Sequence, residues 1–170
     1  MVGEHLAEVA GEELVAADAL IDTSDLTGRE LRDRLVAEAL ESEEHVGVRL
    51  TSFGYKHGIP LEADLVFDVR AAANPHWVPD LRPLDGRSKE ISEYVLNDPI
   101  GASLLAAIHA YLRGTIAAYL ADGRGRLNIA IGCTGGRHRS VAILQALAAL
   151  LEREVDGAGI VVEHRDIDRR

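Results

Sequence analysis

The stretch LNIAIGCTGGRHRSVAILQALAALL, residues 127–151, indicates the fold class on its own. Its first part, Leu127 to Gly132, is an apolar run with the length and composition of a buried strand. From Val141 onward apolar residues recur at helical spacing, and the segment between the two runs contains a glycine pair. A strand, a glycine-rich loop and a helix in this order predict an α/β fold.

Three other apolar segments are typical of strands, and they run from about Val46 to Phe53, from Leu65 to Arg70 and from Gly159 to His164. Two helices are expected between them, from Ser88 to about Leu96 and from Pro99 to Gly123. Strands joined through helices need crossover connections, which favour parallel pairing. We therefore predict an α/β fold with a mostly parallel sheet and crossover helices, and a ligand site at the carboxyl edge of that sheet.

The N-terminal part carries two local signals. Residues 19–26 have the pattern of a short buried strand followed by a turn. Thr27 and Glu30 have the spacing of a capping box, which predicts a helix that continues to about Leu40.

Composition narrows the class of protein. With 170 residues, 47% of them apolar, the chain is long enough for one domain with a core. The single cysteine excludes an intrachain disulfide and favours a reducing compartment. We see neither a secretory signal nor a segment with the ~20 apolar residues of a membrane helix. We therefore expect a cytoplasmic protein without a membrane partner.

The charge is negative overall and unevenly distributed. A formal net charge of −10 argues against a surface devoted to nucleic acid, because such surfaces rely on clustered lysine and arginine. Acidic residues crowd the first 45 positions, whereas basic residues gather around Arg137 and Arg139 and at the C-terminus. This distribution is compatible with a local positive pocket in an acidic protein.

The segment CTGGRHRS, residues 133–140, has the features of an anion site. Amides in the first turn of a helix lack helical partners, and the helix dipole favours negative charge there. Glycines let a ligand approach the backbone closely, and an arginine grips two phosphate oxygens at once. A tight turn without a ligand is the alternative, but it would not require two arginines and a histidine. The candidate ligand-binding residues of this loop are Thr134, Gly135, Gly136, Arg137, His138, Arg139 and Ser140.

The same segment also fits a catalytic role. Cys-x5-Arg-Ser is the phosphate-loop pattern of cysteine-dependent phosphatases, and Cys133, Arg139 and Ser140 match it. In that chemistry a thiolate attacks phosphorus and the arginine stabilises the equatorial oxygens. Asp80 is the candidate general acid. The pattern is short, and a lone cysteine at a strand end is more often a small buried apolar group, so the phosphatase is the alternative to a binding role.

Basic and hydrogen-bonding residues follow the other predicted strands as well. Because the carboxyl ends of parallel strands meet at one edge, we expect these residues to line the same pocket as the loop. The competing interpretations are a solvated lysine after the first strand and a structural turn packed under Trp77 after the second. No set of His, Cys and acidic residues has metal-ligand spacing, so neither a metal nor a cofactor is predicted. The candidates after these strands are Lys56, Arg70, Asn74, His76 and His164.

Three segments resemble the RapZ family of bacterial RNase adapter and nucleotide-binding proteins. They are SFGYKHGIPLEADLVFDVR (52–70), NPHW (74–77) and IGCTGGRHRSV (131–141), and the pair His164-Arg165 fits the end of the pattern. ALIDTSDLTGREL (19–31) resembles the segment that joins the two domains of the family. We therefore predict an N-terminal segment over residues 1–44 and a RapZ C-terminal-like domain over residues 45–170.

The resemblance implies a regulatory adapter and sensor and not an enzyme. It implies that the C-terminal domain senses glucosamine-6-phosphate, binds small regulatory RNA for presentation to an endoribonuclease, and forms homo-oligomers. The family's kinase-like domain is not expected here, because no G-x-x-x-x-G-K-[ST] pattern occurs in these 170 residues, and nucleotide hydrolysis is not carried over. Asp166 and Asp168 dilute the arginines of the last residues, which predicts weak or salt-dependent RNA affinity. A pure interaction module with a vestigial pocket is the third alternative.

Overall fold

The computed structural model describes residues 23–24, 26–31, 47–121, 126–154 and 159–169. The chain divides into two compact units, Met1–Glu41 and Ser42–Arg170. In the first unit the expected capping box is present, since the Glu30 amide donates to Thr27 Oγ1 (3.3 Å) and the Thr27 amide donates to Glu30 Oε2 (2.9 Å). The strand expected at 19–26 and the continuation of this helix to Leu40 lie mostly outside the described residues.

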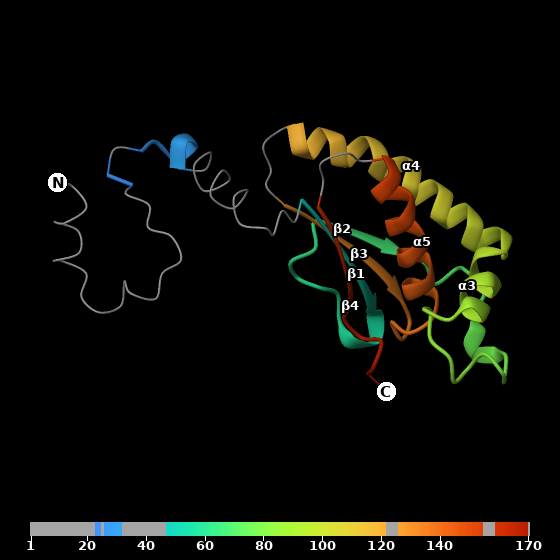
Figure 1. Cartoon of the computed structure of the whole chain (residues 1–170). Coiled ribbons are helices and arrows are strands. Elements are labelled where there is room, and N and C mark those ends of the chain that lie inside the picture. Colours follow the sequence, from blue (N-terminus) through green and yellow to red (C-terminus); the bar gives the residue numbers. More distant parts are fainter. Residues whose placement is uncertain (1–22, 25, 32–46, 122–125, 155–158, 170) are drawn as a thin grey trace. The chain divides into compact units, whose positions relative to one another are not determined.

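The second unit is built on a four-stranded parallel sheet with strand order β2-β3-β1-β4, which confirms the predicted α/β class (Figure 1). In the central strands Gly54 is paired with Cys133, and on the other side of β3 Asp68 is paired with Gly132. The carboxyl ends of three neighbouring strands therefore lie next to one another. The strands are β1 (Val48–Gly54), β2 (Leu65–Asp68), β3 (Leu127–Cys133) and β4 (Ile160–His164).

Among the described residues of the second unit, three α-helices accompany the sheet: α3 (Lys89–Leu96), α4 (Pro99–Ala121) and α5 (Arg139–Glu154). The hydroxyl of Ser88 caps α3 by accepting a hydrogen bond from the Ile91 amide. Helix α4 begins at a proline, whose missing N–H costs nothing in the first turn. Its N-terminus is fixed to the preceding loop, because Asp98 Oδ2 accepts from the amides of both Gly101 (2.9 Å) and Ala73 (3.0 Å).

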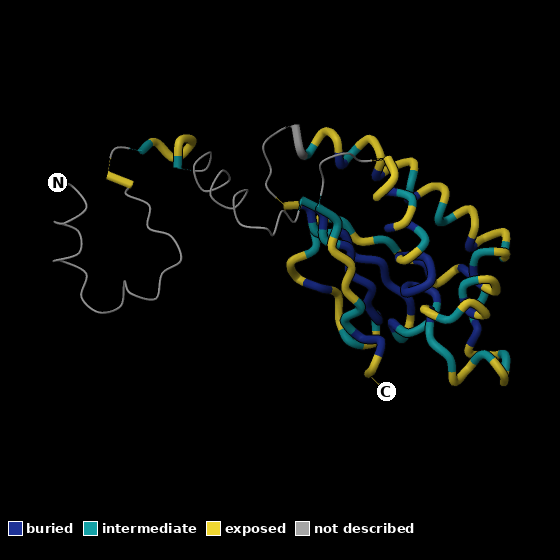
Figure 2. The backbone as a smooth tube through the Cα atoms, viewed as in Figure 1, coloured by how far each residue is buried: buried dark blue, intermediate teal, exposed yellow. Residues whose placement is uncertain are grey.

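The core lies between the sheet and the helices. Helix α5 packs directly on β1, β3 and β4, and α3 and α4 pack against α5. Ile129 on β3, Leu144 on α5 and Leu112 on α4 belong to one buried cluster and are at most 1% exposed. Figure 2 shows that buried residues gather where the strands and α5 lie. Burial of this kind is the main source of folding free energy. It holds the start of α5, and with it the loop from β3, in a fixed position.

The connection from β1 to β2 is a loop without an α-helix. Residues 55–64 contain only the short 3-10 helix η2 (Tyr55–His57) before the chain reaches β2. The end of the connection is fastened to β3, since the Asp64 amide donates to the Asn128 carbonyl (2.9 Å) and Asp64 Oδ2 accepts from the Asn128 amide (2.8 Å). Lys56, in η2, is thereby held close to the carboxyl ends of β1 and β3, where its amide donates to the Thr134 carbonyl.

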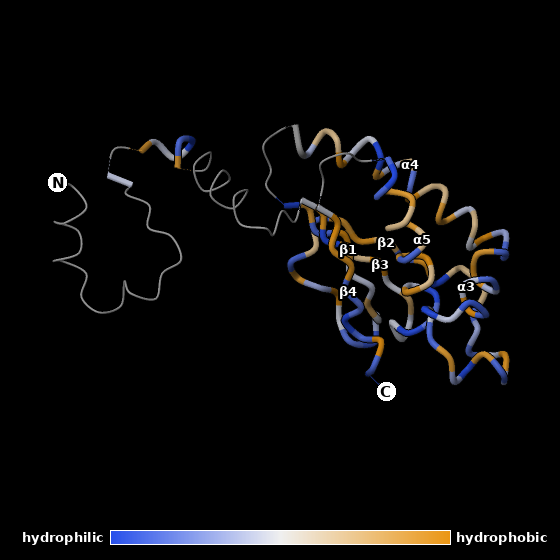
Figure 3. The backbone as a smooth tube through the Cα atoms, in the orientation of Figure 1, coloured by the Kyte–Doolittle hydropathy of each residue, from blue (hydrophilic) through white to orange (hydrophobic). Residues whose placement is uncertain are grey.

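Helix α4 contradicts the expectation that no segment is long and apolar enough to cross a membrane. The 21 residues Pro99–Tyr119 meet that criterion by length and composition, with a mean hydropathy of 1.3. Only 22% of an 18-residue apolar stretch within this helix is buried. Figure 3 shows α4 as hydrophobic along much of its length. Its buried residues Ile108, Leu112 and Ile116 belong to the core described above. That the protein has no membrane partner therefore stays a prediction, and the composition of α4 does not support it.

Candidate functional site

The loop between β3 and α5 leaves several backbone amides without protein partners. One amide of the loop, that of Gly136, donates to Sγ of Cys133 (3.3 Å). The remaining loop amides make no hydrogen bond to any residue that the structure describes. Such amides at the start of a helix are free to bind an anion. They belong to Thr134, Gly135, Arg137 and His138.

The two glycines of the loop have different structural roles. Gly136 has a φ of +74°, and a Cβ there would lie 2.6 Å from the Gly54 amide nitrogen and 2.9 Å from Cβ of Asp166. Only glycine satisfies both constraints without strain. At Gly135 φ is not positive, and a Cβ would meet only Cε of Lys56, at 3.9 Å. Gly136 therefore seats the loop against β1, whereas Gly135 lies beneath the Lys56 side chain.

Arg139 ties the start of α5 to the segment after β2. Its side chain is buried, with 6% of the residue exposed. The Nη1 group donates to the carbonyls of Arg70 and Ala72, and the Nη2 group donates to Oγ1 of Thr134 (3.2 Å). The guanidinium is thus fixed by the protein and still lines the pocket described below.

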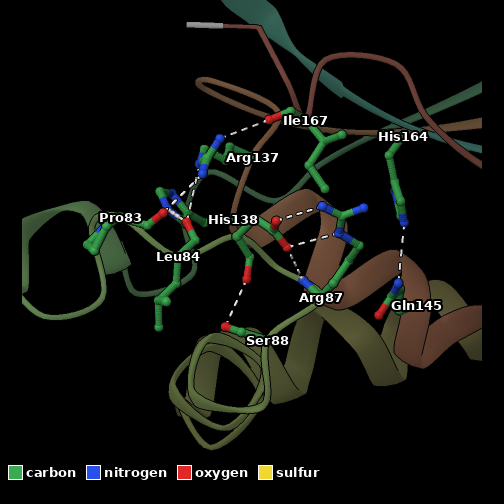
Figure 4. A network of polar contacts seen from close by, with 10 residues as sticks. Pro83, Leu84, Arg87, Ser88, Arg137, His138, Gln145, His164 and Ile167 are labelled. Carbon is green, nitrogen blue, oxygen red and sulfur yellow. Dashed lines mark hydrogen bonds and ion pairs between the residues drawn. The ribbon is translucent and has the colours of Figure 1, made fainter.

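Arg137 and His138 fasten the loop to two other segments (Figure 4). The Arg137 guanidinium donates to the carbonyls of Pro83 (3.0 Å), Leu84 (3.2 Å) and Ile167 (3.2 Å). His138 Nε2 lies 2.9 Å from the same Leu84 carbonyl. Burial lowers the pKa of His138, although backbone hydrogen bonds oppose the shift. These two side chains therefore brace the site in addition to lining it.

Cys133 is a buried thiol with an altered acidity. Its Sγ lies 3.2 Å from Oγ of Ser140, and the residue is 3% exposed. Burial raises the pKa of the thiol, but the hydrogen bonds with Ser140 and from the Gly136 amide, together with the charge of Arg139, outweigh that effect. The net result is a pKa below the usual value for cysteine, which is the direction that a nucleophilic or redox-active thiol requires.

A pocket of about 690 Å³ opens at this edge of the sheet. Arginine, lysine and histidine dominate its wall, and none of the lining residues is acidic. The volume lies in the range of small-molecule sites. The lining residues are Lys56, Asn74, His76, Trp77, Arg82, Pro83, Cys133, Thr134, Gly135, Arg137, His138, Arg139 and Arg169.

Most of the residues expected from sequence come together in this pocket, and four do not line it. Gly136 and Ser140 lie behind its wall, where both make hydrogen bonds with Sγ of Cys133. Arg70 pairs with Asp68 (2.7 Å) and lies over the ring of Tyr55. Only its backbone carbonyl serves the site, as an acceptor for Arg139.

His164 points to a different part of the domain. Its Nδ1 lies 2.8 Å from Oγ of Ser52, and its Nε2 lies 3.4 Å from the side-chain nitrogen of Gln145 on α5 (Figure 4). Burial lowers its pKa, and the charge of Arg87 adds to that shift. Asp80, the candidate general acid of the phosphatase alternative, is exposed and does not line the pocket.

Sequence reasoning missed Arg82, Pro83 and Arg169, which line the pocket from segments outside the strand ends. It also treated Asp166 as a diluent of positive charge, whereas the structure buries this residue completely. Asp166 accepts hydrogen bonds from the Gly54 amide (2.8 Å) and from Arg165, and it pairs with Arg169 (3.3 Å). The contact with Gly54 joins residues 112 positions apart, so no local pattern reveals it.

Comparison with known proteins places this geometry in a family. The family model described as the RapZ C-terminal domain matches residues 46–168. The chain belongs to the RapZ C-terminal domain family. It is 45% identical over 91% of its length to a nucleotide-binding protein of Rhodococcus jostii, and 44% identical over 98% of its length to one of Streptomyces coelicolor. A nucleotide-binding protein of Paramagnetospirillum magneticum is 43% identical over 91% of the chain.

This RapZ-like chain spans about half the length of the curated relatives it matches. It covers 51% of the Rhodococcus protein, 54% of the Streptomyces protein and 50% of the Paramagnetospirillum protein. The family match includes every residue of the pocket except Arg169.

Proposed function

We propose that this RapZ C-terminal domain is a regulatory sensor that binds a phosphorylated sugar, such as glucosamine-6-phosphate, in the pocket at the carboxyl edge of the sheet. The observation that carries the proposal is the set of unpartnered amides after β3, which face no competing carboxylate in the pocket wall. Amides at a helix N-terminus and a nearby guanidinium favour a doubly charged phosphate. Membership of the RapZ family supports a regulatory role.

The rest of the pocket suits a sugar ring. Asn74 and His76 offer hydrogen-bonding groups, and the amide side chain of Asn74 already accepts from the His76 backbone amide (3.3 Å). Trp77 lines the pocket with 75% of its surface exposed, which is unusual for so large an apolar side chain. An indole ring at this position offers a flat surface for a sugar. In this arrangement the loop amides bind the phosphate of the ligand, and the Asn74–Trp77 segment binds the hydroxyls of its sugar ring.

The binding proposal is tested by ligand-induced stabilisation. Glucosamine-6-phosphate at 100 times its dissociation constant should add about 2.7 kcal/mol to the free energy of unfolding. Arg139→Lys keeps a positive charge but loses the planar fork, so we expect a much smaller shift. Arg87→Gln is the matched control, because Arg87 is exposed, pairs with Asp85 and does not line the pocket. A wild-type melting temperature that responds to no phosphorylated sugar would refute the sensor.

Cysteine-dependent phosphatase activity is the second candidate, and the contact between Cys133 and Ser140 favours it. A hydroxyl bonded to the sulfur stabilises a thiolate that attacks phosphorus and later leaves it. Against it, no carboxylic acid lines the pocket to protonate the leaving group. Hydrolysis of an aryl phosphate that disappears in Cys133→Ser would establish this activity in place of simple binding.

The proposed macromolecular partners are a small RNA, an endoribonuclease and further copies of the chain. The net charge of −10 limits RNA affinity to local basic surfaces. RNA binding measured across salt concentrations tests this part, since a contact with phosphates must weaken steeply as salt rises. Binding that does not respond to salt, or no binding at all, would leave a sensor of the sugar alone.

The proposed cytoplasmic location can be checked by cell fractionation.

A further inference from the structure

The cations of the pocket fall into two groups according to their partners. The guanidinium groups of Arg137 and Arg139 both donate to backbone carbonyls, and that of Arg139 also donates to Thr134. Arg82, by contrast, donates only through Nε, to the His76 carbonyl (3.0 Å). Its two terminal nitrogens make no hydrogen bond or ion pair with the residues that the structure describes, and the residue is exposed. A pocket-facing guanidinium with two uncommitted nitrogens is equipped to bind an anion.

Arg169 is the second cation at the mouth of the pocket. Its Nη1 lies 3.3 Å from Oδ1 of Asp166, and 57% of its side chain is exposed. Asp166 is itself fully buried and fixed by the Gly54 amide. Burial raises the pKa of Asp166, but the hydrogen bonds from Arg165 and Gly54 outweigh that effect and the net pKa is lowered. An ionised and immobile carboxylate therefore holds Arg169 at the pocket.

A third arginine connects the two segments that carry these exposed arginines. Arg137 binds the carbonyl of Pro83, the residue after Arg82, and the carbonyl of Ile167, two residues before Arg169. One guanidinium thus bridges the two segments that carry the exposed arginines (Figure 4). We call Arg82 and Arg169 the rim pair. Both line the same pocket, and a bound anion would be attracted to each of them even though Asp166 already pairs with Arg169.

The rim pair is distinct from the cations that serve the loop amides. Lys56 lies over the loop, because a Cβ on Gly135 would be 3.9 Å from Lys56 Cε. Arg139 reaches the loop through Thr134. The loop amides with these two cations form a complete environment for one phosphate, and the rim pair is not needed for it. The volume of about 690 Å³ leaves room for a ligand that reaches both places.

We propose that the pocket contains two anion subsites, the loop amides and the rim pair, so that a phosphosugar with a second phosphoryl group binds in it more tightly than a monophosphate such as glucosamine-6-phosphate. This inference rests on the proposed function, because it assigns the first phosphate to the loop. A monophosphate would fill the loop subsite alone. A sugar bisphosphate engages both subsites and binds more tightly.

Calorimetric titration with glucose-6-phosphate and glucose-1,6-bisphosphate tests the proposal. We expect the bisphosphate to bind at least about tenfold more tightly, a difference of about 1.4 kcal/mol. In the double variant Arg82→Gln/Arg169→Gln, that advantage should fall below about threefold while monophosphate affinity changes little. Arg87→Gln is the matched control, because its side chain is as exposed as that of Arg169 (53% and 57%) and it does not line the pocket. It should retain the full advantage.

The outcomes separate this inference from the function on which it rests. Equal affinity of the wild-type protein for the two sugars would overturn the rim subsite and leave the sensor intact. A double variant that loses monophosphate and bisphosphate affinity in equal proportion would also overturn it, because the rim pair would then act as a general positive field. If neither of these sugars, nor glucosamine-6-phosphate, nor inorganic phosphate binds the wild-type protein, the proposed function itself fails.

Discussion

The sulfur of Cys133 lies 3.2 Å from the hydroxyl of Ser140, across the loop that joins β3 to α5. This contact and the Gly136 amide help to lower the pKa of the thiol in spite of its burial. Replacing the hydroxyl removes part of the stabilisation of the thiolate, so Ser140→Ala should raise the pKa of Cys133. The rate of alkylation by iodoacetamide, followed against pH, should rise at a higher pH in the variant than in the wild-type protein.

Ser103→Ala, an exposed substitution on α4, is the control for that experiment and should leave the alkylation profile unchanged. A Ser140→Ala profile that coincides with the wild-type profile would show that the hydroxyl does not govern the acidity of the thiol. The result bears on both candidate functions, because a thiolate beside the loop amides adds negative charge that a bound phosphate must tolerate.

The two adjacent glycines of the loop should respond differently to alanine. Gly136→Ala forces a side chain into a left-handed conformation and against the backbone of Gly54, which costs on the order of 1–3 kcal/mol and displaces the loop. Gly135→Ala meets only Cε of Lys56 at 3.9 Å and should fold normally. Urea denaturation measures both variants, and similar losses of stability in the two would contradict the assigned roles.

Helix α4 offers a second matched pair of glycines. A Cβ on Gly114 would meet nothing within 4 Å, so Gly114→Ala should stabilise the protein by about 1 kcal/mol through helix propensity. A Cβ on Gly101 would lie within van der Waals overlap of the Val95 carbonyl, so Gly101→Ala should destabilise it by about 1–3 kcal/mol. Chemical denaturation of both variants at one pH tests the signs. A neutral or destabilising Gly114→Ala would contradict the open surroundings that the described residues leave at this position.

The sequence predicted those parts of the fold that depend on local patterns. Apolar runs located β1 and β3, and Ser88 marked the start of α3, because strand periodicity and helix capping are local properties. The loop after β3 was recognised for the same reason. Arg82 and Asp166 were missed because their roles depend on which distant segments the fold brings together. Arg70 was expected to line the same pocket, but its side chain pairs with Asp68, two residues away, and does not line it.

Two histidines should make the stability of the domain depend on pH. Burial lowers the pKa of His138 and of His164, and Arg87 also lowers that of His164 while Asp85 opposes it. A lowered pKa means that the unfolded chain binds protons more readily than the folded one. The stabilising contribution of each neutral ring is therefore complete above the unfolded value of about 6.5 and is lost as pH falls through the folded pKa. The free energy of unfolding should decrease from pH 8 to pH 5.5.

Urea titrations at these two pH values measure the effect, and His138→Gln/His164→Gln should flatten it. Both proteins should carry Cys133→Ser, because the lowered pKa of the thiol contributes with the same sign between these pH values. His164→Gln alone should remove only part of the slope, because His138 remains and titrates in separate surroundings. His138 contacts the Leu84 carbonyl, whereas His164 contacts Ser52. An unchanged slope in the double variant would assign the pH dependence to other groups and show that these rings are protonated without cost.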